Sequence, residues 1–319
     1  MNAVVSPRPR PADTHSPLLS YGGQKPPAPA WFAQALANEP EALFLDIDGS
    51  SIEVLRWGTA TAKAPLLLLH GNGASADWWR FIAPFLSQDR QVVACSWPGM
   101  GHSDWRDHYA IDDFVQLADA VAEQAGLLQA KVPPVLVGHS YGGMVTCLSA
   151  ARAVVPWSAA VIIDSLLVDF HSRQGWDVLG DPARAASQTW PKANIFGSLE
   201  EALTRFRFLP PQPSVSDYVT DFIARSALKP VGDAWTWRTD PKLRFLGIQD
   251  GRLDEALPRI KSPLTLIRGE LSALVSAKGM ETMAAVAPAE TRFIAVPEAY
   301  HHVPVDQPLA LVAALRAVL

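Results

Sequence analysis

Cysteine is scarce in this chain of 319 residues, which contains only Cys95 and Cys147. Both lie in apolar segments that we expect in the protein core. We therefore interpret them as small buried hydrophobic residues in a reducing compartment, rather than as a disulfide or a pair of metal ligands.

A surplus of positive charge is also missing. The chain has 27 lysines and arginines against 32 aspartates and glutamates, a formal net charge of −5, and no long basic run. Nucleic acids and anionic membrane surfaces attract clustered lysine and arginine. We therefore expect neither of them as a partner.

Apolar runs of bilayer length are absent as well, since crossing a membrane takes about 20 consecutive apolar residues. The first thirty residues have no hydrophobic signal core, and they hold seven of the 27 prolines. This composition predicts a disordered, proline-rich extension over residues 1–30 and a cytoplasmic protein.

Hydrophobic residues are abundant, at 49% of the chain, and they occur in short runs. The segments 42–48 and 52–57 flank Asp48-Gly49 and predict a β-hairpin. Solid apolar runs farther along predict buried strands, and segments with helical spacing lie between them. This alternation predicts an α/β fold with a mostly parallel sheet and helices on both faces. The predicted strands are 64–69, 92–95, 134–138, 159–164, 264–268 and 291–296, and the predicted helices are 76–86, 111–126, 144–150, 276–287 and 307–319.

The alternation stops between residues 165 and 258. Strand-like runs vanish there, and tryptophans and prolines become frequent. We predict a helical insert in this region. The expected organisation is a disordered extension at 1–30, a first part of the core at 31–164, the insert at 165–258 and a second part of the core at 259–319.

The most informative stretch is Gly138–Gly143, with the sequence Gly-His-Ser-Tyr-Gly-Gly. It lies between an apolar run and a helix-compatible run. Gly-x-Ser-x-Gly in that setting is typical of a nucleophile elbow, in which small residues let the chain turn tightly around the serine. The following helix directs its first amides toward the site, where negative charge is favoured. Ser140 is therefore the candidate nucleophile.

Together with this motif, the segments His70–Gly73, Pro98–Ser103 and His301–Pro308 resemble the α/β-hydrolase superfamily. The layout is most similar to the lidded branch that contains epoxide hydrolases, haloalkane dehalogenases and carbon–carbon bond hydrolases. The resemblance implies an α/β-hydrolase fold with the insert as a helical lid. Epoxide and haloalkane enzymes of this branch use an aspartate at the elbow, so Ser140 argues against both activities.

A serine needs a general base to become a strong nucleophile. The resemblance places this base after the last strand, where the chain has His301 and His302. His301 stands five residues before Asp306, the separation usual in the family, so we favour His301 and keep His302 as the alternative. A polar surface loop or a metal pair would also explain adjacent histidines, but further spaced ligands are lacking in the sequence, and we expect no metal.

The acid that orients the base has two candidates. Many family members carry an aspartate shortly after the strand that ends near Gly269, and this chain has Ser272 there. Asp164 ends the strand after the elbow helix, an alternative position in the family, and could accept a hydrogen bond from His301. We favour this catalytic role for Asp164 over the structural alternative, in which it caps the first turn of the lid. Glu270 is the second candidate, with a surface ion pair as its other interpretation.

Two backbone amides are expected to form the oxyanion hole, those of Asn72 and Tyr141, as the resemblance implies. His70 is expected to support the loop that carries Asn72, and His139 to be structural. Several tryptophans suggest an apolar pocket, although packing within the core and the lid explains most of them equally well. The candidates for pocket residues are Trp97, Trp176 and Trp190.

These residues predict a serine hydrolase that cleaves a carboxylic ester or lactone of a medium-sized hydrophobic substrate through an acyl-enzyme, without a cofactor. Two alternatives remain open. The first is hydrolysis of a carbon–carbon bond in a diketone-like compound, and the second is a non-catalytic member of the fold that binds a small molecule.

Overall fold

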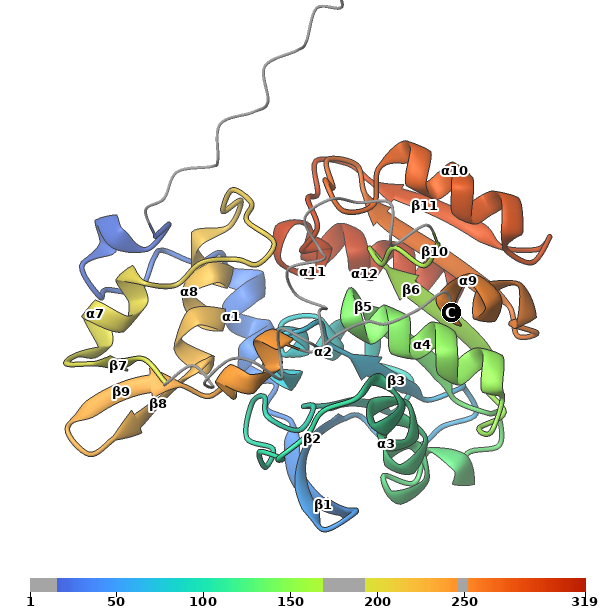
Figure 1. The fold of residues 1–319 in the computed structure, drawn as a ribbon, viewed down its shortest axis with the longest axis horizontal. Helices are drawn as coiled ribbons and strands as arrows, with labels where there is room; N and C mark the ends of the chain where they lie inside the picture. The colour runs from blue at the N-terminus through green and yellow to red at the C-terminus, as the bar shows by residue number, and fades with distance from the viewer. Residues whose placement is uncertain (1–15, 169–192, 246–251) are drawn as a thin grey trace, which may run out of the picture.

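The computed structural model describes residues 16–168, 193–245 and 252–319 (Figure 1). An eight-stranded sheet forms its centre, in the order β1-β2-β4-β3-β5-β6-β10-β11. β1 and β2 form the predicted hairpin, β2 pairs antiparallel with β4, and every later pair is parallel. The strands are β1 Glu41–Ile47, β2 Ser50–Trp57, β3 Leu66–Leu69, β4 Val92–Cys95, β5 Val135–His139, β6 Ala159–Ile163, β10 Leu264–Gly269 and β11 Arg292–Val296. The prediction of an α/β fold with a mostly parallel sheet is confirmed.

Helices cover both faces of the sheet because successive side chains of each strand point to opposite faces. In β3, Leu67 and Leu69 pack in one apolar cluster, and Leu66 and Leu68 pack in another. The first cluster includes side chains of α3 Ile111–Gln124, α4 Tyr141–Arg152, α9 Arg252–Ala256 and α10 Ala277–Val286. The second includes side chains of α1 Ala30–Ala37, α2 Ala83–Leu86, α11 Val303–Asp306 and α12 Pro308–Val318.

One helix of the core was predicted as continuous, and this prediction is wrong. Residues 76–86 make a 3₁₀ turn, η2 Ala76–Trp79, and then the short helix α2 rather than one continuous helix. Pro84 lies in the first turn of α2. Proline has no amide hydrogen for a helical bond and crowds the preceding turn, so a helix that starts at residue 76 cannot continue through it undisturbed.

The insert between β6 and β10 is not purely helical, which corrects the sequence-based prediction. It contains α7 Leu199–Thr204 and α8 Asp217–Ser226, but also a three-stranded antiparallel sheet. Its strands are too short for a periodic pattern, and two of them join through a turn at Gly232, which has a φ of 58°. The strand order is β7-β9-β8, with β7 Ile195–Phe196, β8 Leu228–Val231 and β9 Ala234–Trp237.

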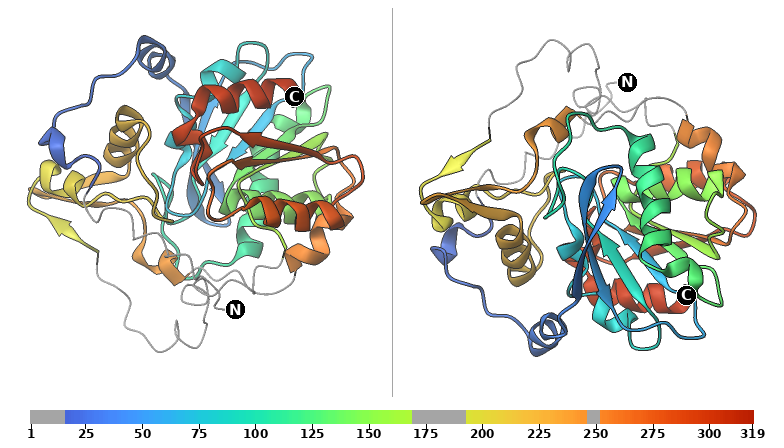
Figure 2. Two further views of the ribbon diagram at one scale, coloured as in Figure 1. Left: turned by 90° about the horizontal axis from the view of Figure 1, so that it is seen from above. Right: turned by 90° about the horizontal axis from the view of Figure 1, so that it is seen from below.

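The predicted disordered extension is wrong for its described part, residues 16–30. A short turn, η1 Leu19–Tyr21, precedes α1, and this segment runs beside the lid (Figure 2). The Ser16 hydroxyl donates to the Leu203 carbonyl at 2.8 Å, and Leu18 is buried. Partners in the distant lid hold this segment, and its own composition does not reveal them. Residues 1–15 lie outside the described residues.

None of the helices in the described ranges is both long and apolar enough to span a membrane.

Candidate active site

The elbow is a tight turn between β5, which ends at His139, and α4, which begins at Tyr141. Ser140 lies between them with φ 53° and ψ −118°, a conformation that residues other than glycine rarely adopt. A Cβ atom at Gly138 would approach the Gly142 carbonyl oxygen to 2.2 Å, so the chain can pass there only with glycine. The turn raises the Ser140 side chain above the carboxyl edge of the sheet.

His301 joins the two other predicted members of the site. It stands on the loop between β11 and α11, and its Nε2 lies 2.9 Å from the Ser140 hydroxyl oxygen. Its Nδ1 lies 2.8 Å from Oδ1 of Asp164. The structure therefore brings together Ser140, His301 and Asp164 from three separate segments of the chain.

Of the two candidate acids, Asp164 is the one that contacts His301. It follows β6 with a φ of 47°, and its side chain is fully buried. The Gly269 amide donates to Oδ2 at 2.7 Å. The alternative acid, Glu270, is exposed, and its carboxylate accepts a hydrogen bond from the Glu298 amide at 3.2 Å.

Ser272 supports this acid, a role that the sequence analysis missed. Its hydroxyl donates to Oδ1 of Asp164 at 2.7 Å and accepts from the amides of Leu274 and Val275 at 3.2 and 3.0 Å. Because the two amides occupy the lone pairs of the hydroxyl, its proton remains directed at the carboxylate. The position of Ser272 could have indicated this role, because many members of the family carry their catalytic acid there.

The two predicted oxyanion donors belong to segments that lie next to Ser140. Tyr141 is the first residue of α4, so its amide has no partner within the helix. The loop that carries Asn72 runs close to the elbow: a Cβ atom added at Gly71 would lie only 3.1 Å from Cβ of Ser140. His70 holds this loop: its Nδ1 donates to the Gly71 carbonyl at 2.7 Å, and its Nε2 accepts from the Trp97 amide at 3.1 Å. Burial lowers the pKa of His70 to about 3, which keeps the ring neutral.

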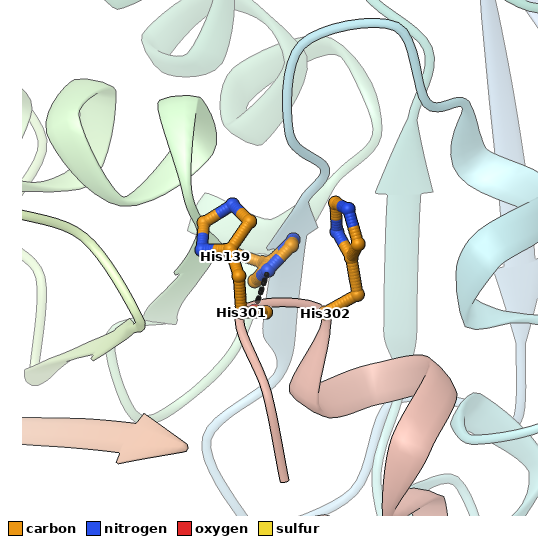
Figure 3. A group of neighbouring side chains, drawn as sticks. All are labelled: His139, His301 and His302. Carbon is orange, nitrogen blue, oxygen red and sulfur yellow. Dashed lines mark hydrogen bonds between the residues drawn. The ribbon is translucent and has the colours of Figure 1, made fainter. Parts of the chain in front are cut away.

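Three buried histidines meet beside the elbow (Figure 3). His139 donates from Nε2 to the His301 carbonyl at 2.9 Å and thereby fixes the base loop against β5. Burial, reinforced by the neighbouring His301, lowers the pKa of His139 to about 3 and that of His302 well below its ordinary value. His302, the alternative base, packs against Trp78 and Phe208 and forms no hydrogen bond through its ring with any described residue.

The structure does not support the predicted pocket residue that it describes, Trp97. Trp97 is fully buried, donates its indole N–H to the His70 carbonyl at 2.9 Å and stacks on Phe114, so its prediction as a pocket residue is wrong. Through these contacts it packs against the loop that carries Asn72, the predicted oxyanion donor. The other two predicted pocket residues, Trp176 and Trp190, lie outside the described residues.

A glutamine of the insert between β6 and β10, which we call the lid, is bound to the loop that carries His301. Nε2 of Gln212 donates to both oxygens of Asp306 at 2.9 and 3.0 Å, and its Oε1 accepts from the His302 amide at 3.0 Å. The Tyr300 amide also donates to Asp306, at 2.9 Å. Burial raises the pKa of Asp306 to about 7. The backbone amides on both sides of His301 are therefore held in place, that of Tyr300 by Asp306 and that of His302 by Gln212. No sequence pattern indicated this contact.

Comparisons with known proteins place this geometry in context. A sequence model of the alpha/beta hydrolase family matches residues 66–315. An esterase of Mycobacterium tuberculosis is 27% identical over 289 residues, which cover 90% of this chain and 92% of the esterase. The monoglyceride lipase of Rattus norvegicus is 22% identical over 274 residues, which cover 81% and 82% of the two chains. Among solved structures, the thioesterase domain from the curacin biosynthetic pathway has a TM-score of 0.73 at 21% identity, covering 88% of this chain and all of that domain. The predicted α/β-hydrolase fold is confirmed.

Proposed function

The chain belongs to the alpha/beta hydrolase family, and we propose that it is a serine hydrolase that cleaves carboxylic esters or lactones through an acyl-enzyme. One observation carries this proposal: the His301 ring contacts the Ser140 hydroxyl at 2.9 Å and the Asp164 carboxylate at 2.8 Å. The similarity to proteins named esterase and monoglyceride lipase supports esters as the substrate class.

Proton transfer begins the reaction. His301 carries a hydrogen on Nδ1, which it donates to Asp164, so Nε2 is free to accept the proton of Ser140 as the hydroxyl oxygen attacks the substrate carbonyl. The imidazolium that forms is stabilised by the buried carboxylate. It then gives its proton to the leaving alcohol, and the acyl-enzyme remains on Ser140.

The negative charge of the tetrahedral intermediate is held by the amides of Asn72 and Tyr141. Such preorganised donors stabilise charge that develops only in the transition state, each by about 3–4 kcal/mol in comparable sites. A water molecule activated by His301 then attacks the acyl-enzyme and releases the acid. No step in this sequence requires a metal or an organic cofactor.

The substrate is proposed to be a medium-sized hydrophobic molecule, rather than a nucleic acid or a membrane surface. The aromatic side chains of Trp78 and Phe208 pack against His302 beside the loop that carries His301, and such apolar surroundings of the base support an apolar substrate. The net charge of −5 supports an uncharged or weakly charged substrate over a polyanion.

Covalent labelling with a fluorophosphonate probe tests this function. We expect one labelled serine per chain, complete loss of labelling and of p-nitrophenyl ester hydrolysis in Ser140→Ala, and an unchanged circular dichroism spectrum. Ser149→Ala, which removes a hydroxyl from the same helix, is the matched control and should keep the label. Full ester turnover by Ser140→Ala would refute the assignment.

The same experiment separates the two alternatives. A protein that binds a small molecule without catalysis would neither react with the probe nor turn over esters. A carbon–carbon bond hydrolase would act on a dienoate diketone in preference to p-nitrophenyl esters. We expect the esters to be the better substrates.

A further inference from the structure

We propose that His139, His301 and His302 form a binding site for one divalent transition-metal ion of the Zn²⁺ type, and that an ion bound there inhibits the enzyme (Figure 3). The inhibition rests on the proposed function, because it requires His301 to be the general base. Metal binding by itself does not depend on that function.

The three rings converge from two parts of the fold. His139 is the last residue of β5, and the other two histidines end the loop between β11 and α11, directly before the first residue of that helix. One ring nitrogen of each residue lies within 4.8 Å of one from each of the others, and all three side chains are buried. The sequence analysis found no third ligand near the adjacent histidines, and His139 supplies it from 162 positions away along the chain.

The hydrogen bonds that two of the rings donate leave a lone pair on the other nitrogen of each ring. His139 donates from Nε2 to the His301 carbonyl, so Nδ1 carries a lone pair. His301 donates from Nδ1 to Asp164, so Nε2 carries a lone pair; the Ser140 hydroxyl contacts it at 2.9 Å, and a metal ion would displace that contact. A histidine that binds a metal almost always donates its other N–H to a carboxylate or a backbone carbonyl, which orients the ring. Both arrangements are already present here.

His302 lacks such partners. Neither of its ring nitrogens forms a hydrogen bond with any described residue, although the ring is only 4% exposed and the Pro210 carbonyl is near enough to favour its protonated form slightly. A buried polar group without a partner is costly, so each such group calls for an explanation. A metal ion would provide the missing partner.

The distances predict which ring moves. Zn–N bonds of about 2.0–2.1 Å in a tetrahedral site place ligand nitrogens roughly 3.4 Å apart, closer than the 4.8 Å limit of this cluster. The His139 ring is held by one hydrogen bond and the His301 ring by two. The His302 ring is held mainly by packing against aromatic rings, so it is the ring that we expect to swing inward.

The ligand chemistry selects the ion. Three neutral imidazoles suit Zn²⁺, Cu²⁺ and Ni²⁺, whereas Mg²⁺ and Ca²⁺ prefer oxygen ligands. An ion bound to Nε2 of His301 takes the lone pair that would accept the proton of Ser140. The hydrolytic rate should therefore fall, and a chelator should restore it.

Metal binding is measured first, without reference to activity. Zn²⁺ is titrated by calorimetry, and Co²⁺ by its visible absorption, into the wild type and into Ser140→Ala. We expect one ion per chain in both proteins and at least tenfold weaker binding in His302→Gln. His302→Phe, which keeps an aromatic ring against Trp78 and Phe208, is the second variant and should show the same loss. His108→Gln removes an exposed histidine and should bind as the wild type does.

Inhibition is measured next, with each protein compared with its own metal-free rate. Zn²⁺ should inhibit the wild type and His108→Gln, with recovery on addition of EDTA, and should inhibit both His302 variants at least tenfold less strongly. Equal Zn²⁺ affinity in the wild type and in the His302 variants would overturn the proposal, as would an absence of binding to the wild type. Binding of Zn²⁺ by a protein without ester turnover would instead overturn the proposed function and leave the metal site standing.

Discussion

Two residues of the site share an unusual backbone conformation. Ser140 and Asp164 both have a positive φ, 53° and 47°, although neither is glycine. Strain of this kind costs of order 1–3 kcal/mol per residue and persists only where the surroundings hold the chain in place. The Ser140 amide donates to the Ile163 carbonyl, and the Asp164 amide donates to the Ile267 carbonyl. Each residue directly follows a strand, and its amide is bound to the neighbouring strand. These bonds fix the backbone so that both side chains point toward His301.

Exchange of the acid tests which carboxylate orients the base. Asp164→Asn should lower kcat by about four orders of magnitude, because an amide in this position favours the wrong tautomer of His301. Glu270→Gln is the matched control, and its kcat should stay within about twofold of the wild type. Steady-state hydrolysis of a p-nitrophenyl ester measures both. A large loss in Glu270→Gln together with a small loss in Asp164→Asn would reverse the assignment.

Ser272 is predicted to be a positioning residue that acts through Asp164. Ser272→Ala removes a 2.7 Å hydrogen bond to a buried carboxylate, an interaction worth about 1.5–3 kcal/mol. We expect kcat to fall about tenfold or more while KM changes little. Ser276→Ala is the control: it removes a hydroxyl that caps α10 and should lower stability by about 1 kcal/mol without changing kcat. A parallel fall of kcat in both variants would indicate general destabilisation instead.

At the scale of elements, sequence patterns succeed where local residues decide the structure. The strand Val92–Cys95 is apolar throughout and was predicted with its correct bounds. The glycines of the elbow and the separation of His301 from Asp306 likewise belong to short segments. Patterns fail where residues far apart in the chain determine the structure. The short lid strands form only when they pair in a sheet, and the Gln212–Asp306 contact joins segments 94 positions apart. The acid remained open for the same reason, since only the fold determines whether Asp164 or Glu270 reaches the base.

The contact between lid and base loop predicts a pH dependence of stability. Burial raises the pKa of Asp306 from its ordinary value of 3.8 to about 7 in the folded protein. The folded state therefore retains a proton between about pH 4 and 7 that the unfolded state has lost, so this residue makes the free energy of unfolding fall as pH rises through that window. The slope is at most about 1.4 kcal/mol per pH unit, and it levels off above pH 7.

Urea unfolding of the wild type and of Asp306→Asn at several pH values measures this slope. The stability of the wild type relative to the variant should decrease from pH 5 to pH 7 and stay constant above pH 8. Asp233→Asn, an exposed aspartate in the turn between β8 and β9, should leave the pH profile of the wild type unchanged. A stability difference that is constant over this range would show that Asp306 does not retain its proton.

At the scale of the whole molecule, core, lid and N-terminal segment share one aromatic cluster. Phe32 of α1 is buried, with its ring centre 4.9 Å from that of Tyr218 and 6.0 Å from that of Phe222 in the lid helix α8. It also lies 5.6 Å from Phe81, which precedes α2 in the core. A single side chain of the N-terminal segment therefore contacts both of the other parts, which predicts that they unfold together.

Truncation of this side chain tests that coupling. Phe32→Ala should lower the free energy of unfolding by about 3–5 kcal/mol, because it leaves a cavity among packed rings. If the three parts are coupled, the lid should become sensitive to proteolysis at the same temperature at which the core loses its circular dichroism signal. Phe44→Ala removes the same atoms from an exposed position on β1 and should change stability by less than about 0.5 kcal/mol. Loss of the lid well below the unfolding temperature of the core would mean that the lid is a separate folding unit.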